Sequence, residues 1–174
     1  MIKQSLNQNW FLHKNNCATP FPATIPTSVY TVLADNGQIP DPYWKGNEDV
    51  VRDVIDEDYT YTCTFSPLPE LLEEDACILR FDGIDTISDV YFNDILLGQT
   101  ANMHRTWEFD VTSLLLREKN QLKVVLHSPL KAADEAFAQC ATRGSEDAWE
   151  GFSHIRKAHY MYGWDWGAHR SEEH

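Results

Sequence analysis

Positive charge is scarce in this sequence. Lysine and arginine together number 14 against 27 aspartates and glutamates, which leaves a net charge of -13. Nucleic-acid phosphates are bound by clustered cationic side chains, so this balance argues against nucleic acid as a partner. An acidic surface instead suits a neutral or cationic ligand. The two densest acidic runs, "NEDVVRDVIDEDY" and "PELLEEDA", are interpreted as solvated faces or turns.

Long hydrophobic runs are also absent. The sequence contains no stretch of about eighteen apolar residues, the length that a membrane span needs. Its opening segment, "MIKQSLNQNW", lacks the apolar centre of a secretory signal. We therefore expect a cytoplasmic protein with no membrane partner.

Cysteines are few and far apart. The chain contains four of them and no C-x-x-C pair. Zinc sites are commonly built from closely spaced cysteine and histidine ligands, so we expect no metal site. In a reducing compartment such thiols are interpreted as buried or idle. Their positions are Cys17, Cys63, Cys77 and Cys140.

The motifs of several common enzyme classes are missing as well. The sequence has no G-x-S-x-G nucleophile elbow, no P-loop, no G-x-G-x-x-G dinucleotide motif and no H-E-x-x-H zinc motif. Its 7 histidines are scattered. We therefore expect no cofactor, and the residue pattern alone defines no complete catalytic constellation.

Short segments of alternating β-branched and aromatic residues are abundant. Period-two alternation of this kind is typical of strands, and the "ND" at 93–94 indicates a hairpin turn. Many short strands with few helices predict an all-β sandwich. The predicted strand-forming segments are 9–16, 59–65, 76–84, 88–100, 103–112, 120–128 and 154–162.

Helices are predicted at two places only. Ser28 can cap a short helix through Asp35, with Gly37 placed to end it. Pro129 suits the first turn of a second helix of about three turns. Prolines at 20, 22 and 26 are expected to prevent regular structure in the segment that they occupy.

The most distinctive segment is "RKAHYMYGWDWGAH", residues 156–169, which surrounds Asp165 with aromatic side chains. Two interpretations of Asp165 remain open. As a structural residue it would accept backbone N–H bonds in the turn between Gly163 and Gly167. As a functional residue it would accept hydrogen bonds from sugar hydroxyls while an indole covers an apolar face of the sugar.

This segment resembles the motif near the end of the first domain in β-mannosidases of glycoside hydrolase family 2. Other stretches agree with that family in the same order, and the likeness extends from about residue 10 to about residue 169. The resemblance implies a jelly-roll, galactose-binding-like β-sandwich over residues 1–169. The agreeing stretches are "IPTSVYTVLADNGQIPDPYWKGNE", "FDGIDTISDVYFNDILLGQTANMHRTWEFDVT" and "LKVVLHSPLKAADEA".

The resemblance also implies a function and a set of partners. In that family an immunoglobulin-like domain and a (β/α)8 barrel follow, and the barrel carries both catalytic glutamates. The implied activity is that of a retaining enzyme hydrolysing terminal β-D-mannose residues. This chain would be an N-terminal fragment with no catalytic residue of its own. Trp164 and Asp165 match the family residues that help to hold the terminal mannose. The family's chemistry needs no metal or cofactor.

The sequence departs from the family pattern at two points. Ala101 stands where the family commonly has an aspartate, and "RSEEH" replaces the proline-containing loop and strand that usually follow the motif. Residues 170–174 are therefore interpreted as a non-native tail from truncation. Two alternatives remain open: a free-standing carbohydrate-binding module, and the first domain of a family 2 β-galactosidase or β-glucuronidase.

Overall fold

The structure is a sandwich of two antiparallel sheets of unequal size. The computed structural model describes residues 2–15, 17–141, 152–158 and 160. Within them, a 6-stranded sheet has the order β2-β1-β3-β8-β5-β6, and β4 and β7 form a 2-stranded sheet. The strands are β1 (Trp10–Lys14), β2 (Phe21–Ala23), β3 (Tyr59–Phe65), β4 (Ile78–Phe81), β5 (Ile87–Phe92), β6 (Ile95–Ala101), β7 (Trp107–Asp110) and β8 (Asn120–Leu126). The predicted all-β sandwich is confirmed.

Alternating burial along the strands gives the larger sheet its core face. The strand register aligns Leu12 with Tyr61, Tyr61 with Val124, and Val124 with Val90, and all of these side chains are buried. Since side chains alternate between the two faces of a strand, residues two positions apart extend the same face. A second buried row accordingly runs beside the first: Trp10, Cys63, Leu122 and Phe92.

The smaller sheet packs against this face through its aromatic side chains. The rings of Phe81 on β4 and Phe109 on β7 meet edge to face, with centroids 6.2 Å apart. On β6 of the larger sheet, a Cβ added at Gly98 would lie 3.0 Å from a carbon of the Phe109 ring. Glycine at position 98 therefore lets the two sheets approach closely.

The hairpin between β5 and β6 forms where the sequence predicts it. Asn93 and Asp94 both have positive φ, 48° and 64°. Positive φ at both central residues is the signature of a type I′ turn, whose twist matches that of the flanking strands. The "ND" prediction is confirmed.

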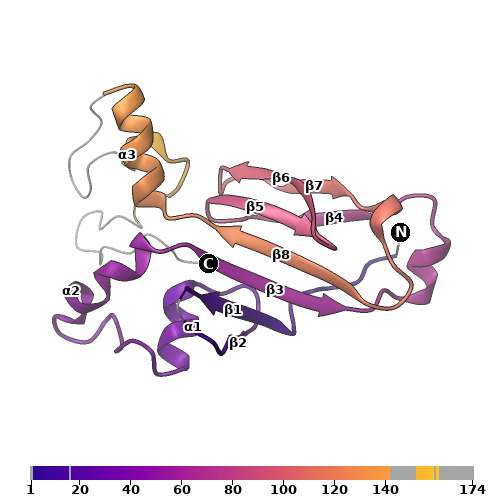
Figure 1. The fold of residues 1–174 in the computed structure, drawn as a ribbon, viewed down its shortest axis with the longest axis horizontal. Helices are drawn as coiled ribbons and strands as arrows, with labels where there is room; N and C mark the ends of the chain where they lie inside the picture. Colours follow the sequence, from indigo (N-terminus) through magenta and orange to yellow (C-terminus); the bar gives the residue numbers. More distant parts are fainter. Residues whose placement is uncertain (1, 16, 142–151, 159, 161–174) are drawn as a thin grey trace.

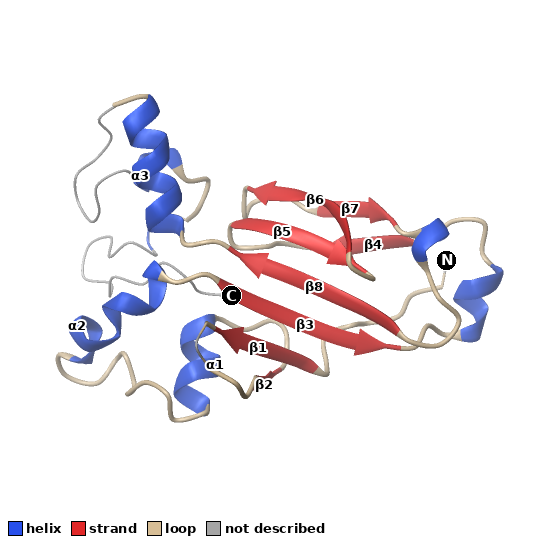
Figure 2. Cartoon of the chain, viewed as in Figure 1, coloured by secondary structure: helices blue, strands red, loops and turns tan. Residues whose placement is uncertain are grey.

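Both predicted helices are present, and further helical turns accompany them. Ser28 caps α1 by accepting a hydrogen bond from the Thr31 N–H at 3.0 Å, and Gly37 follows the helix with a φ of 66°. The α-helices gather at one end of the long axis of the sandwich (Figures 1 and 2). The helical elements are α1 (Val29–Asp35), α2 (Asn47–Val51), α3 (Pro129–Gln139), and the 3-10 turns η1 (Arg52–Asp56), η2 (Pro69–Glu73), η3 (Thr112–Leu114) and η4 (Phe152–His154).

One prediction about the proline-rich segment is wrong. Pro22 lies inside β2, opposite Phe11 of β1, although prolines were expected to prevent regular structure there. Among the described strands β2 is an edge strand. An edge strand leaves one side of its backbone without ladder bonds, so the missing N–H of proline removes no bond from the sheet.

The segments of high negative charge are helical rather than extended. The acidic run that begins at residue 47 forms α2 and η1, in which Val51 and Val54 are buried while Asp49 and Asp53 stay exposed. The second run forms most of η2. Their interpretation as solvated faces is confirmed, but their helical structure was not predicted.

We predict that Asn120→Leu destabilises the protein by about 2 kcal/mol, because it strands hydrogen-bonding groups that the amide now satisfies. Asn120 is fully buried, and its side chain exchanges two hydrogen bonds of 2.8 Å with the backbone of Leu116 and accepts one of 3.0 Å from Asn93. Urea denaturation measures the change. The control is Gln121→Leu at the exposed neighbouring position, and equal losses for both variants would contradict the prediction.

Candidate functional site

The two predicted site residues, Trp164 and Asp165, lie outside the residues that the structure describes. Residues 152–158 and 160 are described, and they include the first residues of the "RKAHYMYGWDWGAH" motif. The contacts of this segment show how the sandwich holds the start of the motif. They belong to the same end of the molecule as the α-helices (Figure 1).

The backbone of this segment is attached to the loop that follows β6. Arg156 forms an isolated parallel bridge with Asn102, and its carbonyl oxygen accepts a hydrogen bond of 3.1 Å from the Met103 N–H. The Ala158 N–H points to the Met103 sulfur at 3.0 Å. The prediction of a strand over 154–162 is wrong for its described residues, because one bridge and a 3-10 turn replace a ladder.

Side-chain packing fixes the same segment from two directions. Ile155 and Ala158 are buried. The His154 ring meets Phe137 of α3 edge to face, with ring centroids 6.1 Å apart. The segment is therefore held between α3 and the end of β6.

A buried ion pair gives the strongest attachment. The Lys157 ammonium contacts the Asp85 carboxylate, and the two side chains are only 1% and 5% exposed. The Thr86 hydroxyl also donates to this carboxylate. Burying both charges carries a desolvation penalty that only close pairing and further hydrogen bonds offset, so loss of one partner strands the other charge. Asp85 thus ties the loop before β5 to the second residue of the motif.

A second polar cluster braces the same end of the sandwich. The Nδ1 of His127 lies 3.2 Å from Asp58 and its Nε2 lies 3.1 Å from Asp89. The Asp58 carboxylate accepts the Ser128 N–H at 2.9 Å, and Gln99 donates to Asp89 at 2.7 Å. The cluster therefore links the residue before β3 to β5 and to the start of α3.

This cluster shifts the pKa values of its members. Burial by itself lowers the pKa of His127, but hydrogen bonds and attraction from Asp58 and Asp89 outweigh burial and raise it above 6.5. Burial raises the pKa of Asp58, but hydrogen bonds from Ser128 and His127, with the charges of His127 and Lys131, lower it below 3.8. The imidazolium and the carboxylate are each stabilised by the other.

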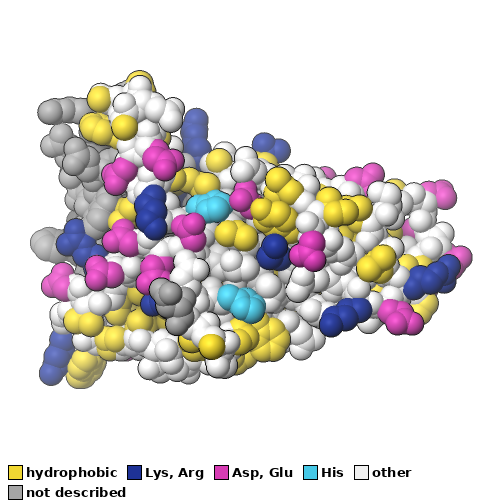
Figure 3. Space-filling view, in the orientation of Figure 1, with side chains coloured by type: hydrophobic (Ala, Val, Ile, Leu, Met, Phe, Trp, Pro, Cys, Tyr) yellow, Lys and Arg dark blue, Asp and Glu magenta, His cyan; other side chains and the backbone are white. Residues whose placement is uncertain are grey.

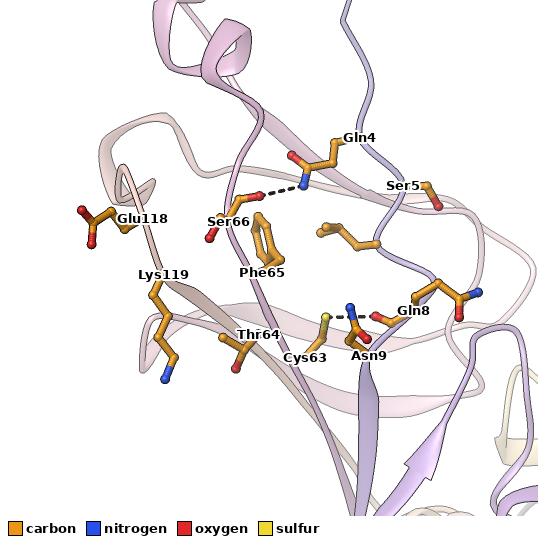
Figure 4. A pocket seen from close by; sticks show the side chains of 11 residues that line it. Gln4, Ser5, Gln8, Asn9, Cys63, Thr64, Phe65, Ser66, Glu118 and Lys119 are labelled. Atoms are coloured by element: carbon orange, nitrogen blue, oxygen red, sulfur yellow. Dashed lines mark hydrogen bonds between the residues drawn. The ribbon is translucent and has the colours of Figure 1, made fainter.

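Two hollows open among the described residues, at different places in the sandwich. One, of about 150 Å³, lies between the sheets beside Asp85 and is walled mainly by apolar side chains such as Trp10, Tyr61 and Phe81. The other, of about 630 Å³, lies where the N-terminal segment crosses the end of β3 (Figure 4). There Gln4 donates a hydrogen bond to the Ser66 carbonyl at 2.9 Å, and the Phe65 ring faces the space.

Neither hollow contains the groups that glycoside hydrolysis needs. A glycosidase uses two carboxylic acids on either side of the bond that it cleaves. The described lining includes one carboxylate in each case, Asp85 in the smaller hollow and Glu118 in the larger. Within the described residues we therefore find no acid pair for catalysis in these spaces.

Other features limit the chemistry of the described part of the chain. It holds no group of at least 3 His, Cys, Asp or Glu residues suited to a metal ion. Its helices include none long and apolar enough to cross a membrane. Acidic and basic side chains are interspersed on the face in Figure 3. All of the thiols are free, and burial raises the pKa of Cys63.

Residues 5–172 match the family described as "Glycosyl hydrolase 2 galactose-binding domain-like", and the chain belongs to this family. The β-D-mannosidase of Dictyoglomus thermophilum has a similar structure, with a TM-score of 0.91 and 34% identity over 97% of this chain and 21% of its own. The β-mannosidase of Mus musculus is 32% identical over 94% of this chain and 19% of its own length. The chain thus spans about a fifth of the length of these relatives.

More distant structures share the fold alone. An exo-chitosanase of Amycolatopsis orientalis is 14% identical with a TM-score of 0.61, and a β-glucuronidase of an uncultured Clostridium is 17% identical with a TM-score of 0.54. Each covers about 70% of this chain, at 71% in both cases. The sandwich is therefore common to glycosidases that differ in their named activities.

We predict that Lys157→Met destabilises the protein by about 3 kcal/mol, since it leaves the Asp85 carboxylate buried without its cation. The double variant Asp85→Leu/Lys157→Met should recover part of that loss, because it removes both charges together. Urea denaturation of the wild type and the three variants, including Asp85→Leu alone, measures the coupling. Additive losses would contradict a direct pairing.

The His127 cluster predicts a specific dependence of stability on pH. The raised pKa of His127 means that its contribution is fully present below pH 6.5 and is lost as pH rises through the folded-state pKa. The lowered pKa of Asp58 means that its contribution is present above pH 3.8 and is lost as pH falls through its own folded-state value. The cluster therefore stabilises the fold most between these limits.

We expect His127→Gln to flatten the loss of stability above pH 6.5. The effect should stay below about 1 kcal/mol, because solvent screens a side chain that is 34% exposed. Thermal unfolding recorded from pH 4 to pH 9 measures it, with His104→Gln at an exposed histidine as the control. A profile for His127→Gln that runs parallel to that of the wild type would rule out this linkage.

Proposed function

We propose that this chain is the galactose-binding-like domain of a retaining β-mannosidase, in which a barrel supplied by the rest of the polypeptide cleaves terminal β-D-mannose residues. The observation that supports this most is the likeness over 97% of the chain to the Dictyoglomus thermophilum β-D-mannosidase, at a TM-score of 0.91. The β-glucuronidases reach TM-scores of only 0.51 to 0.54. Identities of 24% or less with those enzymes give the alternative activity no support beyond the fold.

In this proposal the domain contributes a wall of the sugar site rather than the reacting groups. Trp164 would cover an apolar face of the terminal mannose, and Asp165 would accept hydrogen bonds from its hydroxyls. The buried Asp85–Lys157 pair begins the motif that contains both residues. An ion pair at this position fits a requirement for an accurately placed motif, because small displacements of a binding group reduce catalysis strongly.

The alternative of a free-standing carbohydrate-binding module differs in one testable respect. A module acts by binding, and its gene would encode no barrel. Determining the genomic sequence downstream of the His169 codon separates the two. We expect an open frame that encodes an immunoglobulin-like domain and a barrel with two glutamates, and a frame that closes without them would remove the enzyme proposal.

We predict that Asp165→Asn in the protein encoded by the whole reading frame lowers kcat/KM for an aryl β-D-mannoside by about 10- to 100-fold. Loss of hydrogen bonds to a charged acceptor costs about 1.5–3 kcal/mol. Steady-state kinetics measures the effect, with Asp110→Asn on the exposed surface of β7 as the matched control. Unchanged kinetics for Asp165→Asn would show that this carboxylate does not bind the sugar.

A further inference from the structure

The loop between α1 and α2 holds two neighbouring aromatic side chains in solvent. Tyr43 is 68% exposed and Trp44 is 63% exposed. Large aromatic side chains usually gain their stabilising energy from burial, so this exposure has no evident benefit for the fold. The loop lies at the end of the sandwich that also carries α3 and the start of the motif (Figure 1).

The exposure is imposed by a well-bonded loop. The Asp41 carboxylate accepts the Tyr43 N–H at 2.9 Å, and the Asp41 carbonyl accepts the Trp44 N–H at 3.1 Å. The Asn47 amide donates to the same carbonyl at 2.8 Å, and the Asn47 N–H donates to the Trp44 carbonyl at 3.1 Å. Pro40 and Pro42 fix φ on either side of Asp41. The backbone is thus organised to present the rings outward.

The exposed apolar area is too small for a stable protein interface. A fully exposed aromatic side chain offers roughly 150–250 Å², so the two rings together present roughly 250 Å². Val50 on α2, 67% exposed, adds one aliphatic side chain. A typical interface buries about 800 Å² on each partner. The area matches one or two sugar rings better than it matches a protein surface.

The polar groups around the rings also fit a sugar. Asp41 and Asn47 carry a carboxylate and an amide beside the aromatic pair, and such groups bind hydroxyls. The Lys45 ammonium lies 5.6 Å from the centre of the Trp44 ring. Since acid and base are both present next to the rings, a neutral ligand is better matched than an anion.

We infer that the Tyr43–Trp44 loop is a carbohydrate-stacking platform that binds a sugar unit of an oligosaccharide beyond its terminal mannose. The inference rests on the proposed function for the identity of the sugar, because only a β-mannosidase would meet β-mannosides as substrates. It does not rest on Trp164 or Asp165. The platform is a separate binding surface built from the loop and its hydrogen bonds.

The test titrates the full 174-residue chain with β-1,4-mannotriose and follows the indole N–H resonance of Trp44 by NMR. We expect saturable binding that Trp44→Ala weakens about 3- to 10-fold, the range for loss of one stacked ring. Trp44→Phe should retain most of the affinity, since it keeps a ring. The matched control is Leu96→Ala at another exposed apolar side chain.

Each result of this titration decides the inference. Binding that depends on Trp44 and persists in Asp165→Ala supports the platform. If maltotriose binds as tightly with the same dependence, the platform stands and the mannoside assignment falls. If binding is lost only in Asp165→Ala, the proposed function survives and the platform does not. An unmoved Trp44 resonance, or self-association that Trp44→Ala removes, overturns the platform.

Discussion

The buried ion pair between Asp85 and Lys157 is the constraint on which the functional end of this domain depends. It joins two segments that are 72 residues apart in the sequence. The neighbouring contacts are a single backbone bridge at Arg156 and the packing of Ile155 and Ala158. Because charges inside a protein tolerate separation poorly, the pair fixes where the motif starts more strictly than apolar packing could.

The fold could be predicted largely because its information is local. Period-two alternation gave β3 and β8, and the pair Asn93–Asp94 gave the hairpin. The failures have physical causes. The helices of the acidic run depend on burial of Val51 and Val54 against the rest of the molecule, which no local pattern reveals. Pro22 was misjudged because the edge position of β2 is a property of the whole sheet.

The candidate site was less accessible to reasoning from residues. Trp164 and Asp165 were selected through a family resemblance, and the residue pattern alone left a structural role for Asp165 open. Lys157 was visible within the motif, yet its partner could not be inferred, because Asp85 lies in a different segment with no charge pattern that connects the two. The exposed pair at Tyr43 and Trp44 could not be found either, since aromatic residues in a sequence are by default expected to be buried.

The short strand β2 with its proline has a consequence for how the sheet meets other chains. At that border the sheet ends in three residues, one of which cannot donate a backbone hydrogen bond, so an added strand would find little to pair with. The opposite border, β6, is longer and carries half-exposed Ile95 and Leu96. Any extension of the sheet by a foreign strand is thereby directed to one side, where Arg156 already bridges to the residue that follows β6.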